Sequence, residues 1–172
     1  EITTRLVGSE MCIETGTAKD GDYQNIKTIN SVGTSSWTDG SVKTGKTYYY
    51  KIKTVVKTQN GEQTSGFSNV KSAKAVPAKT TLKAKASDAK NVKLTWSKVK
   101  GASGYEIYRS NSKDGKCSKV KTISKGSTTS YKNGKLKKST TYYYKIRAYR
   151  KVNGKKVYGS YSSVVSVKTK AK

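Results

Sequence analysis

The stretch TTYYYKIRAYR (Thr140–Arg150) decides the fold, because its apolar and polar side chains alternate with the period of two that a half-buried β-strand requires. One face of this strand would carry Tyr142, Tyr144, Ile146 and Ala148, and the other Tyr143, Lys145, Arg147 and Tyr149. The same hexapeptide, TYYYKI, occurs in KTYYYKIKTVV (Lys46–Val56), 94 residues earlier. Most of the tyrosine triplet is therefore expected to be core, and the chain is expected to contain a repeat.

The repeat extends well beyond the hexapeptide. Between residues 20–57 and 114–151, 16 of 38 positions are identical, which indicates two tandem copies of one fold. The only proline, Pro77, lies in KAVPAKT between the copies, where a lone proline among small residues is typical of a linker or an edge strand. We therefore predict two domains, at residues 1–76 and 77–172.

The composition favours an all-β chain. Thirteen tyrosines and many Val, Ile and Thr residues are interrupted at short intervals by Gly, Ser, Asn and Asp, and no segment shows a sustained helical period. Seven short strands are predicted in the second repeat, among them NVKLTW (91–96), GYEIYR (104–109) and the long strand Thr141–Val152, which ends at an Asn-Gly turn. Such a series predicts a β-sandwich.

Four segments of the second repeat resemble a known family of domains. VKLTW (92–96), GASGYEIYRS (101–110), LKKSTTYYYKIRA (136–148) and YGSYSSVVSV (158–167) are similar to fibronectin type III domains of secreted Gram-positive bacterial proteins. The resemblance implies two tandem immunoglobulin-like sandwiches. It also implies a tyrosine corner, in which the hydroxyl groups of Tyr142 and Tyr48 bond back to the preceding loop.

The alternation of side chains and the resemblance together predict two sets of residues, one buried and one outward. The predicted structural core consists of Trp96, Tyr105, Ile107, Leu136, Tyr142, Tyr144 and Ile146 in the second domain and of Tyr48, Tyr50 and Ile52 in the first. The outward tyrosines, which are candidates for stacking on a ligand or for packing against lysine stems, are Tyr49, Tyr143 and Tyr149.

The first domain is expected to be incomplete, lacking one or more N-terminal strands. Nothing before Met11 matches the segment that supplies Leu82, Val92, Leu94 and Trp96 to the second domain. EITTRLVG (Glu1–Gly8) has one alternating stripe, enough for one strand but not for two. Three explanations remain open: a truncated or altered N-terminus, a strand donated by another chain through strand exchange, and an upstream reading-frame error.

The residue types argue against an enzyme. The chain has no histidine, which removes most general-base, triad and metal arrangements. Cys12 and Cys117 have no CxxC spacing and are expected to be unpaired thiols, with a bridge between the domains as the alternative. Asp20-Gly21-Asp22 is expected to be a hairpin turn rather than a calcium loop. No catalytic residue, cofactor or metal is predicted.

The positive charge is concentrated in the second half. Residues 1–77 hold 10 basic and 7 acidic side chains (net +3), whereas residues 78–172 hold 26 and 3 (net +23). The field of these charges would attract polyanions. Alternatively, the lysines would form only a solvated face that prevents other strands from pairing with the sheet edges. Lysine outnumbers arginine 23 to 3 there, which disfavours sequence-specific recognition of nucleic acid.

The expected function is a non-catalytic spacer or interaction module of a larger secreted or cell-surface bacterial protein, such as an adhesin or a wall-associated enzyme. This expectation rests on the resemblance. Its partners would be the other domains of the parent protein. The alternative is a carbohydrate- or polyanion-binding module that uses the lysine-rich second domain to bind teichoic acid or glycan.

Overall fold

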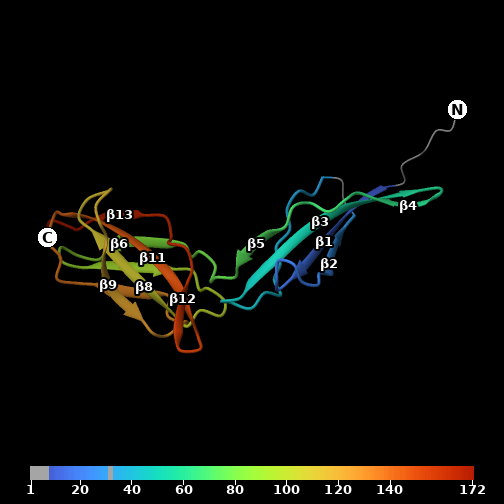
Figure 1. The fold of residues 1–172 in the computed structure, drawn as a ribbon. Helices are drawn as coiled ribbons and strands as arrows, with labels where there is room; N and C mark the ends of the chain where they lie inside the picture. Colours follow the sequence, from blue (N-terminus) through green and yellow to red (C-terminus); the bar gives the residue numbers. More distant parts are fainter. Residues whose placement is uncertain (1–7, 31–32) are drawn as a thin grey trace. The chain divides into compact units, whose positions relative to one another are not determined.

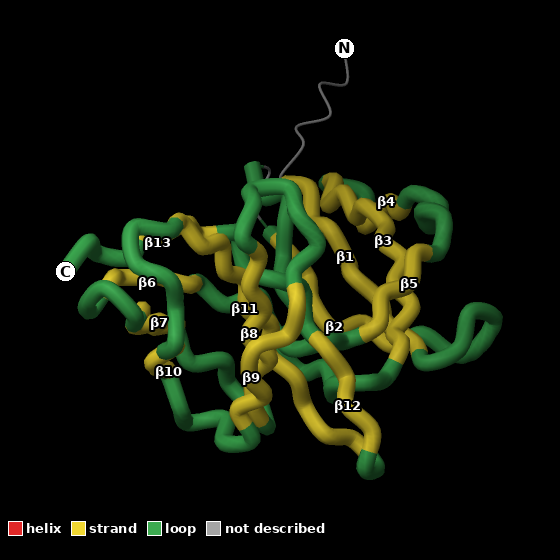
Figure 2. Tube along the Cα trace, turned by 90° about the vertical axis from the view of Figure 1, so that its left-hand side faces the viewer, coloured by secondary structure: helices red, strands yellow, loops and turns green. Residues whose placement is uncertain are grey.

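The computed structural model describes residues 8–30 and 33–172, so the stripe predicted in residues 1–8 falls almost entirely outside the described residues. These residues form thirteen β-strands and no helix (Figure 2), which confirms the all-β prediction. The chain divides into a first unit, Glu1–Ala75, and a second unit, Val76–Lys172. This division lies one residue from the boundary predicted at Pro77.

The second unit is a two-layered sandwich (Figure 1). Its smaller sheet has the order β10-β7-β6, with bounds Ser130–Asn133, Val92–Trp96 and Leu82–Ala86. Its larger sheet has the order β12-β11-β8-β9, with bounds Lys155–Tyr158, Thr141–Val152, Gly104–Ser110 and Ser118–Ile123; β13 (Val165–Lys168) also pairs with β11. All of these pairings are antiparallel.

The last predicted strand of the second unit, around Val165 and Val167, is β13, and the structure adds β12, which was not predicted. Both β12 and β13 lie along the edge of β11 opposite to β8, since Tyr149 pairs with β8 and β12 and Tyr144 with β8 and β13. The seven predicted strands therefore become eight segments in seven positions. Asn153 and Gly154, which join β11 to β12, have φ angles of 48° and 77°, as a tight hairpin turn requires.

The core of the second unit lies between its two sheets. The buried cluster includes all seven residues predicted for this core: Trp96, Tyr105, Ile107, Leu136, Tyr142, Tyr144 and Ile146. The smaller sheet adds Leu82, Val92 and Leu94. On β11 the even-numbered side chains from Tyr142 to Ala148 are buried, as the alternation predicts.

The first unit consists of a single sheet in the described residues, with order β2-β1-β3-β4 and with β5 also paired to β3. The bounds are Gly8–Gly16 (β1), Gln24–Ile29 (β2), Thr47–Thr58 (β3), Gly61–Thr64 (β4) and Lys71–Lys74 (β5). From β2 to β5, each strand begins and ends 94 residues before its counterpart, β9, β11, β12 and β13. The first unit thus repeats the larger sheet of the second unit.

No described residue of the first unit forms a counterpart of the smaller sheet. The offset of 94 places the counterparts of β6 and β7 at or before residue 2, and the counterpart of β10, residues 36–39, is irregular. The described residues of the first unit therefore form one sheet, and the predicted lack of N-terminal strands concerns positions outside the described residues and stays a prediction. The core prediction for Ile52 is wrong: its side chain is 38% exposed, whereas that of Ile146 is fully buried, because no second sheet covers Ile52 among the described residues.

Candidate binding surfaces

The tyrosine corner is present in both units. The backbone N–H of Lys137 donates to the hydroxyl oxygen of Tyr142 over 3.0 Å, and that of Lys43 donates to Tyr48 over 3.0 Å. Tyr142 is buried, whereas Tyr48 is half-buried. These hydroxyl groups anchor the loop before the long strand. The corner tyrosines are therefore structural in both copies.

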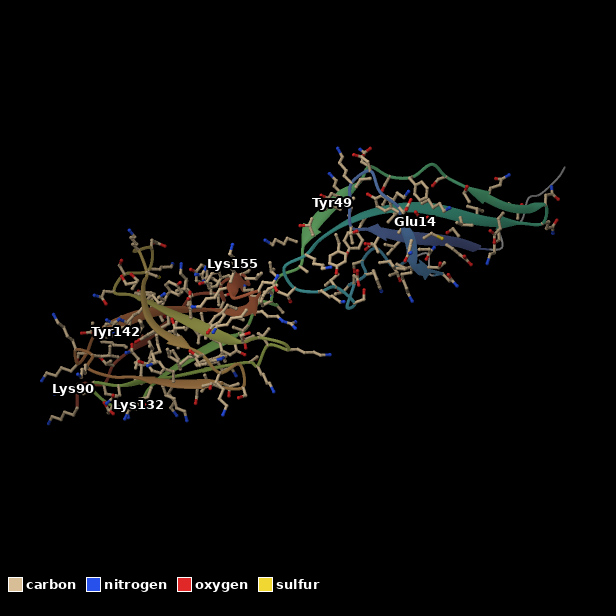
Figure 3. The ribbon with its side chains drawn as sticks, turned by 60° about the horizontal axis from the view of Figure 1, so that its bottom comes forward. Glu14, Tyr49, Lys90, Lys132, Tyr142 and Lys155 are labelled. Atoms are coloured by element: carbon tan, nitrogen blue, oxygen red, sulfur yellow. The ribbon has the colours of Figure 1, made fainter. Side chains whose placement is uncertain are left out.

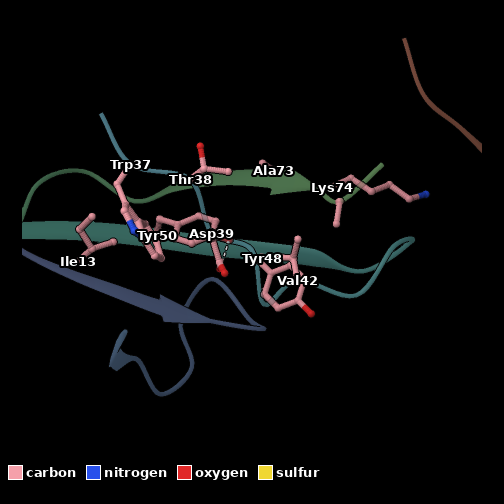
Figure 4. A pocket seen from close by; sticks show the side chains of 10 residues that line it. Ile13, Trp37, Thr38, Asp39, Val42, Tyr48, Tyr50, Ala73 and Lys74 are labelled. Atoms are coloured by element: carbon pink, nitrogen blue, oxygen red, sulfur yellow. Dashed lines mark hydrogen bonds between the residues drawn. The ribbon is translucent and has the colours of Figure 1, made fainter. Parts of the chain in front are cut away.

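A hollow of about 440 Å³ lies on the inward face of the first unit (Figure 4). We use "the hollow" for the space lined by Ile13, Trp37, Thr38, Asp39, Val42, Tyr48, Tyr50, Ala73, Lys74 and Ala75. Most of these side chains are apolar. At the offset of 94, Ile13, Val42 and Tyr50 correspond to Ile107, Leu136 and Tyr144, all of which belong to the buried core of the second unit.

One carboxylate lies in the wall of the hollow. Asp39 accepts hydrogen bonds from the Tyr50 hydroxyl (2.9 Å) and from the Ser41 hydroxyl (2.6 Å) and amide (2.9 Å). Burial and the bond to Asp39 raise the pKa of Tyr50 to about 12. Burial opposes ionisation of Asp39, but the bonds from Ser41 and Tyr50 lower its pKa overall. The counterpart in the second unit is the bond from the Tyr144 hydroxyl to Asn133 (2.8 Å). The Asp39 carboxylate therefore has a structural role.

A cluster of charged and aromatic side chains lies in the second unit, on the face of its larger sheet that points away from the core. We call it the outer cluster: Glu106, Tyr108, Lys119, Arg147, Lys156, Tyr158 and Tyr161. Glu106 is only 1% exposed. Its carboxylate accepts from Tyr108 (2.7 Å), Arg147 (2.9 Å), Lys156 (3.0 Å) and Tyr158 (3.2 Å), and the Lys119 ammonium lies 3.7 Å away.

These contacts set the charge of Glu106. Burial opposes ionisation, but the hydrogen bonds from Tyr108, Arg147 and Lys156 lower its pKa to about 2. The Arg147 guanidinium lies 3.7 Å from the centre of the Tyr158 ring and 4.9 Å from that of Tyr161. Arg147 thus contacts Glu106, Tyr158 and Tyr161 within the same unit. The sequence analysis did not identify Glu106 as a site residue. The signal that identifies it is its pairing with Arg147 on the neighbouring strand.

The three candidate stacking tyrosines differ in their environment. Tyr149 is 1% exposed, so the prediction that it could stack on a ligand is wrong. It lies opposite Gly104, which has no side chain; its hydroxyl donates to the Ile123 carbonyl (3.3 Å), and Tyr158 and the Lys156 ammonium lie against its ring. An added Cβ at Gly104 would lie 2.6 Å from the Tyr149 hydroxyl.

Tyr49 and Tyr143 remain accessible. Both are half-buried. Tyr143 lines a shallow hollow of about 340 Å³ together with Lys113, Asp114, Val164 and Ser166. Of the three predicted stacking residues, these two keep part of the ring exposed to solvent.

Most lysines of the second unit have no acidic partner among the described residues. The ion pairs of this unit all converge on Glu106. Lys90, Lys132 and Lys155 are exposed and extend away from the strands (Figure 3). The positive charge of the second unit is therefore largely uncompensated on its surface.

Within residues 8–30 and 33–172, no three His, Cys, Asp or Glu side chains gather as metal ligands would. Cys12 and Cys117 are both free thiols. The described residues contain no helix of the length and apolarity needed to cross a membrane.

No protein-family model and no curated protein matches the chain. Among solved structures, the FN1–FN3 domains of chicken CNTN1 share 20% sequence identity with it at a TM-score of 0.48, over 95% of this chain and 57% of that one. The crystal structure of FN3tt shares 21% identity at a TM-score of 0.46, over 57% and 99% of the two chains. The sixth fibronectin type III domain of human fibronectin type III domain containing protein 3 shares 18% at 0.48, over 58% and 92%.

This chain thus spans little more than half of the CNTN1 structure. The fold assignment rests on the strand order and the core described above rather than on these similarities.

Proposed function

We propose that the chain is a non-catalytic spacer and interaction module of a larger extracellular or cell-surface protein. One observation carries the proposal: the second unit is a closed sandwich with a continuous core, and the same sheet is repeated in the first unit. Tandem sandwiches of this kind hold other domains apart and present surfaces for contact. The resemblance of VKLTW and the tyrosine corner to bacterial secreted domains supports a bacterial surface origin, such as an adhesin or a wall-associated enzyme.

The experiment that tests the spacer role is the folding of the second unit alone. A spacer domain must fold without its neighbours, so residues 76–172 should unfold in one cooperative transition at the melting temperature of the same unit in the full chain. With Trp37→Phe in the full chain, the fluorescence of Trp96 would report the unfolding of the second unit in both samples. A non-cooperative melt of the isolated unit, with the full chain cooperative, would reject an independent spacer.

A second candidate function is polyanion binding by the second unit. It is favoured by the net charge of +23 in residues 78–172 and by ion pairs that use only one carboxylate there. Lysine-dominated attraction of this type is non-specific and falls steeply with salt. The ligand class would be a teichoic-acid-like or glycan polyanion, and Tyr49 and Tyr143 are the aromatic residues available for stacking on sugars.

Retention on an immobilised anionic polymer would test this second function. We expect the second unit to bind at low salt and to elute well below 1 M salt, and a variant with Lys90, Lys132 and Lys155 changed to Gln to elute earlier. Unchanged elution of that variant would show that these lysines do not contribute. Binding that persists at high salt would indicate a specific site instead of a diffuse field.

A further inference from the structure

We propose that the outward face of the smaller sheet of the second unit binds a flexible linear polyol-phosphate polymer through a row of three lysines. This proposal rests on the second candidate function, polyanion binding, and names the surface and the polymer chemistry. We use "the lysine row" for Lys85 on β6, Lys93 on β7 and Lys132 on β10. These strands are neighbours in the order β10-β7-β6 (Figure 2), so the row crosses the whole sheet.

The strand register places the three lysines directly opposite one another. Lys93 pairs with Lys85 on one side and with Lys132 on the other. On β7 the exposed Lys93 lies between Val92 and Leu94, both of which are fully buried, and the same alternation exposes the other two lysines. Neighbouring strands lie about 4.8 Å apart, so the row concentrates three positive charges within about 10 Å at the level of the backbone.

Two of the carboxylates of the second unit belong to the other sheet. All residues of this unit are described, and only three of them are acidic: Asp88, Glu106 and Asp114. Glu106 forms its ion pairs with cations on the outward face of the larger sheet. Asp114 lies in the loop between β8 and β9, which both belong to that sheet. Neither residue forms an ion pair with the lysine row.

The third carboxylate, Asp88, compensates the row at most in part. It lies in the turn between β6 and β7, where it accepts hydrogen bonds from the Lys90 amide (2.8 Å) and from the side-chain amide of Asn91 (2.8 and 2.9 Å). These bonds lower the pKa of Asp88, and the charge of Lys132 lowers it further. No ion pair joins Asp88 to the row. One carboxylate thus stands against three ammonium groups, and the row keeps a net positive charge.

Protection of the sheet edges does not account for the central lysine. Lysines on edge strands oppose pairing with other chains, which is a sufficient reason for Lys85 on β6 and Lys132 on β10. β7 is paired on both sides, so Lys93 protects no edge. Like charges directly opposite each other on neighbouring strands also destabilise a sheet. The row therefore carries a cost in stability that a bound polyanion would offset.

The remaining outward positions of the sheet restrict the chemistry of the polymer. They are Lys83, Thr95 and Ser130. With no arginine and no aromatic ring among the six outward positions, this face offers neither bidentate recognition of phosphate nor a platform for stacking bases. Lysine binds phosphate as a point charge. The polymer that fits carries repeated phosphates and no bases.

The spacing of the charges favours a polyol phosphate over inorganic polyphosphate. In a polyol phosphate several bonds separate successive phosphates, which suits cations that lie on strands about 4.8 Å apart. In inorganic polyphosphate successive phosphates share an oxygen and lie closer together than neighbouring strands. A flexible polyol chain would therefore place one phosphate at each lysine of the row as it crosses the sheet.

The test measures the affinity of the full chain for poly(glycerol phosphate) over a range of salt concentrations. The row variant carries Lys85→Gln, Lys93→Gln and Lys132→Gln. The matched control carries the same change at three exposed lysines in separate loops of the second unit, as Lys100→Gln, Lys113→Gln and Lys138→Gln. Both variants lose three charges, so a diffuse field would weaken equally in the two.

We expect the row variant to lose about tenfold in affinity at low salt, and the control to lose much less. Each phosphate contact contributes about 0.7 to the slope of log affinity against log salt for a single-stranded polyanion, so the slope should flatten by about two in the row variant. In urea unfolding the row variant should be at least as stable as the parent, because opposed like charges have been removed. A less stable row variant would contradict the premise that the row destabilises the sheet.

The proposal holds if only the row variant loses affinity for poly(glycerol phosphate). Equal losses in the two variants would overturn it and leave polyanion binding by a diffuse field intact, whereas a parent that fails to bind at low salt would overturn both. Oligo-dT and inorganic polyphosphate, matched in number of charges, complete the comparison. Tighter row-dependent binding of either one would overturn the proposal, because a different polymer would then be the better occupant of the row.

Discussion

Replacing Glu106 by Gln should remove most of the acid sensitivity of the second unit. Glu106 is 1% exposed and accepts hydrogen bonds from Tyr108, Arg147, Lys156 and Tyr158. These contacts lower its pKa from 4.5 to about 2. In the unfolded chain the carboxyl group would titrate near its ordinary pKa. The folded form therefore releases the proton more readily than the unfolded form does.

The sign and size of the effect follow from this difference. A depressed pKa contributes stability that is fully present above the unfolded value, near pH 4.5, and is lost as the pH falls through about 2. One pKa unit corresponds to about 1.4 kcal/mol, so the contribution is on the order of 3 kcal/mol. Against a typical stability of about 5–15 kcal/mol, a loss of this size is readily measured.

The assay is urea unfolding of the full chain between pH 2 and 7. Trp37→Phe in the background leaves Trp96 as the single tryptophan, so that fluorescence reports only the second unit. The free energy of unfolding should fall by about 3 kcal/mol between pH 5 and 2 in the parent and by much less in Glu106→Gln. Asp114→Asn, which removes an exposed carboxylate of the same unit, should keep the parental slope.

Equal pH slopes in the parent and in Glu106→Gln would refute the reasoning, since the carboxylate would then have the same pKa in both states. At pH 7 the Gln variant should also be less stable, because Arg147 keeps its place beside the ring of Tyr158 without an anionic partner. A more stable variant at pH 7 would show that desolvation of Glu106 outweighs its hydrogen bonds.

Three further substitutions test the packing. Trp96→Ala should destabilise the second unit by about 3–5 kcal/mol, and an unchanged thermal melt would contradict its place in the core. Tyr142→Phe should cost about 1 kcal/mol in urea unfolding, and Tyr48→Phe less, because Tyr48 is only half-buried and water replaces the lost acceptor more easily there; equal losses would count against the difference in burial. Gly126→Ala should cost about 1–3 kcal/mol in the same assay, because the added Cβ would collide with the Ala102 carbonyl oxygen, and a neutral result would disprove that close approach.

The internal repeat and the period of two were enough to predict the strands and the core of the second unit. Side chains on one strand face must share an environment, so Tyr142, Tyr144 and Ile146 could be assigned to the core from their spacing alone. The tyrosine corner was expected from the resemblance and is present in both units. Each of these inferences depends on local order along the chain.

The environment of Tyr149, Ile52 and Glu106 was decided only by the tertiary structure. Tyr149 is buried because it lies opposite Gly104 on the neighbouring strand, and Ile52 is exposed because no described layer covers its face. Glu106 is ionised and buried because the β8–β11 register places Arg147 beside it, with Lys156 on the next strand. Alternation along one strand determines which face a side chain occupies. Whether that face is covered, and by which charges, depends on segments distant in the sequence, which only the folded chain brings together.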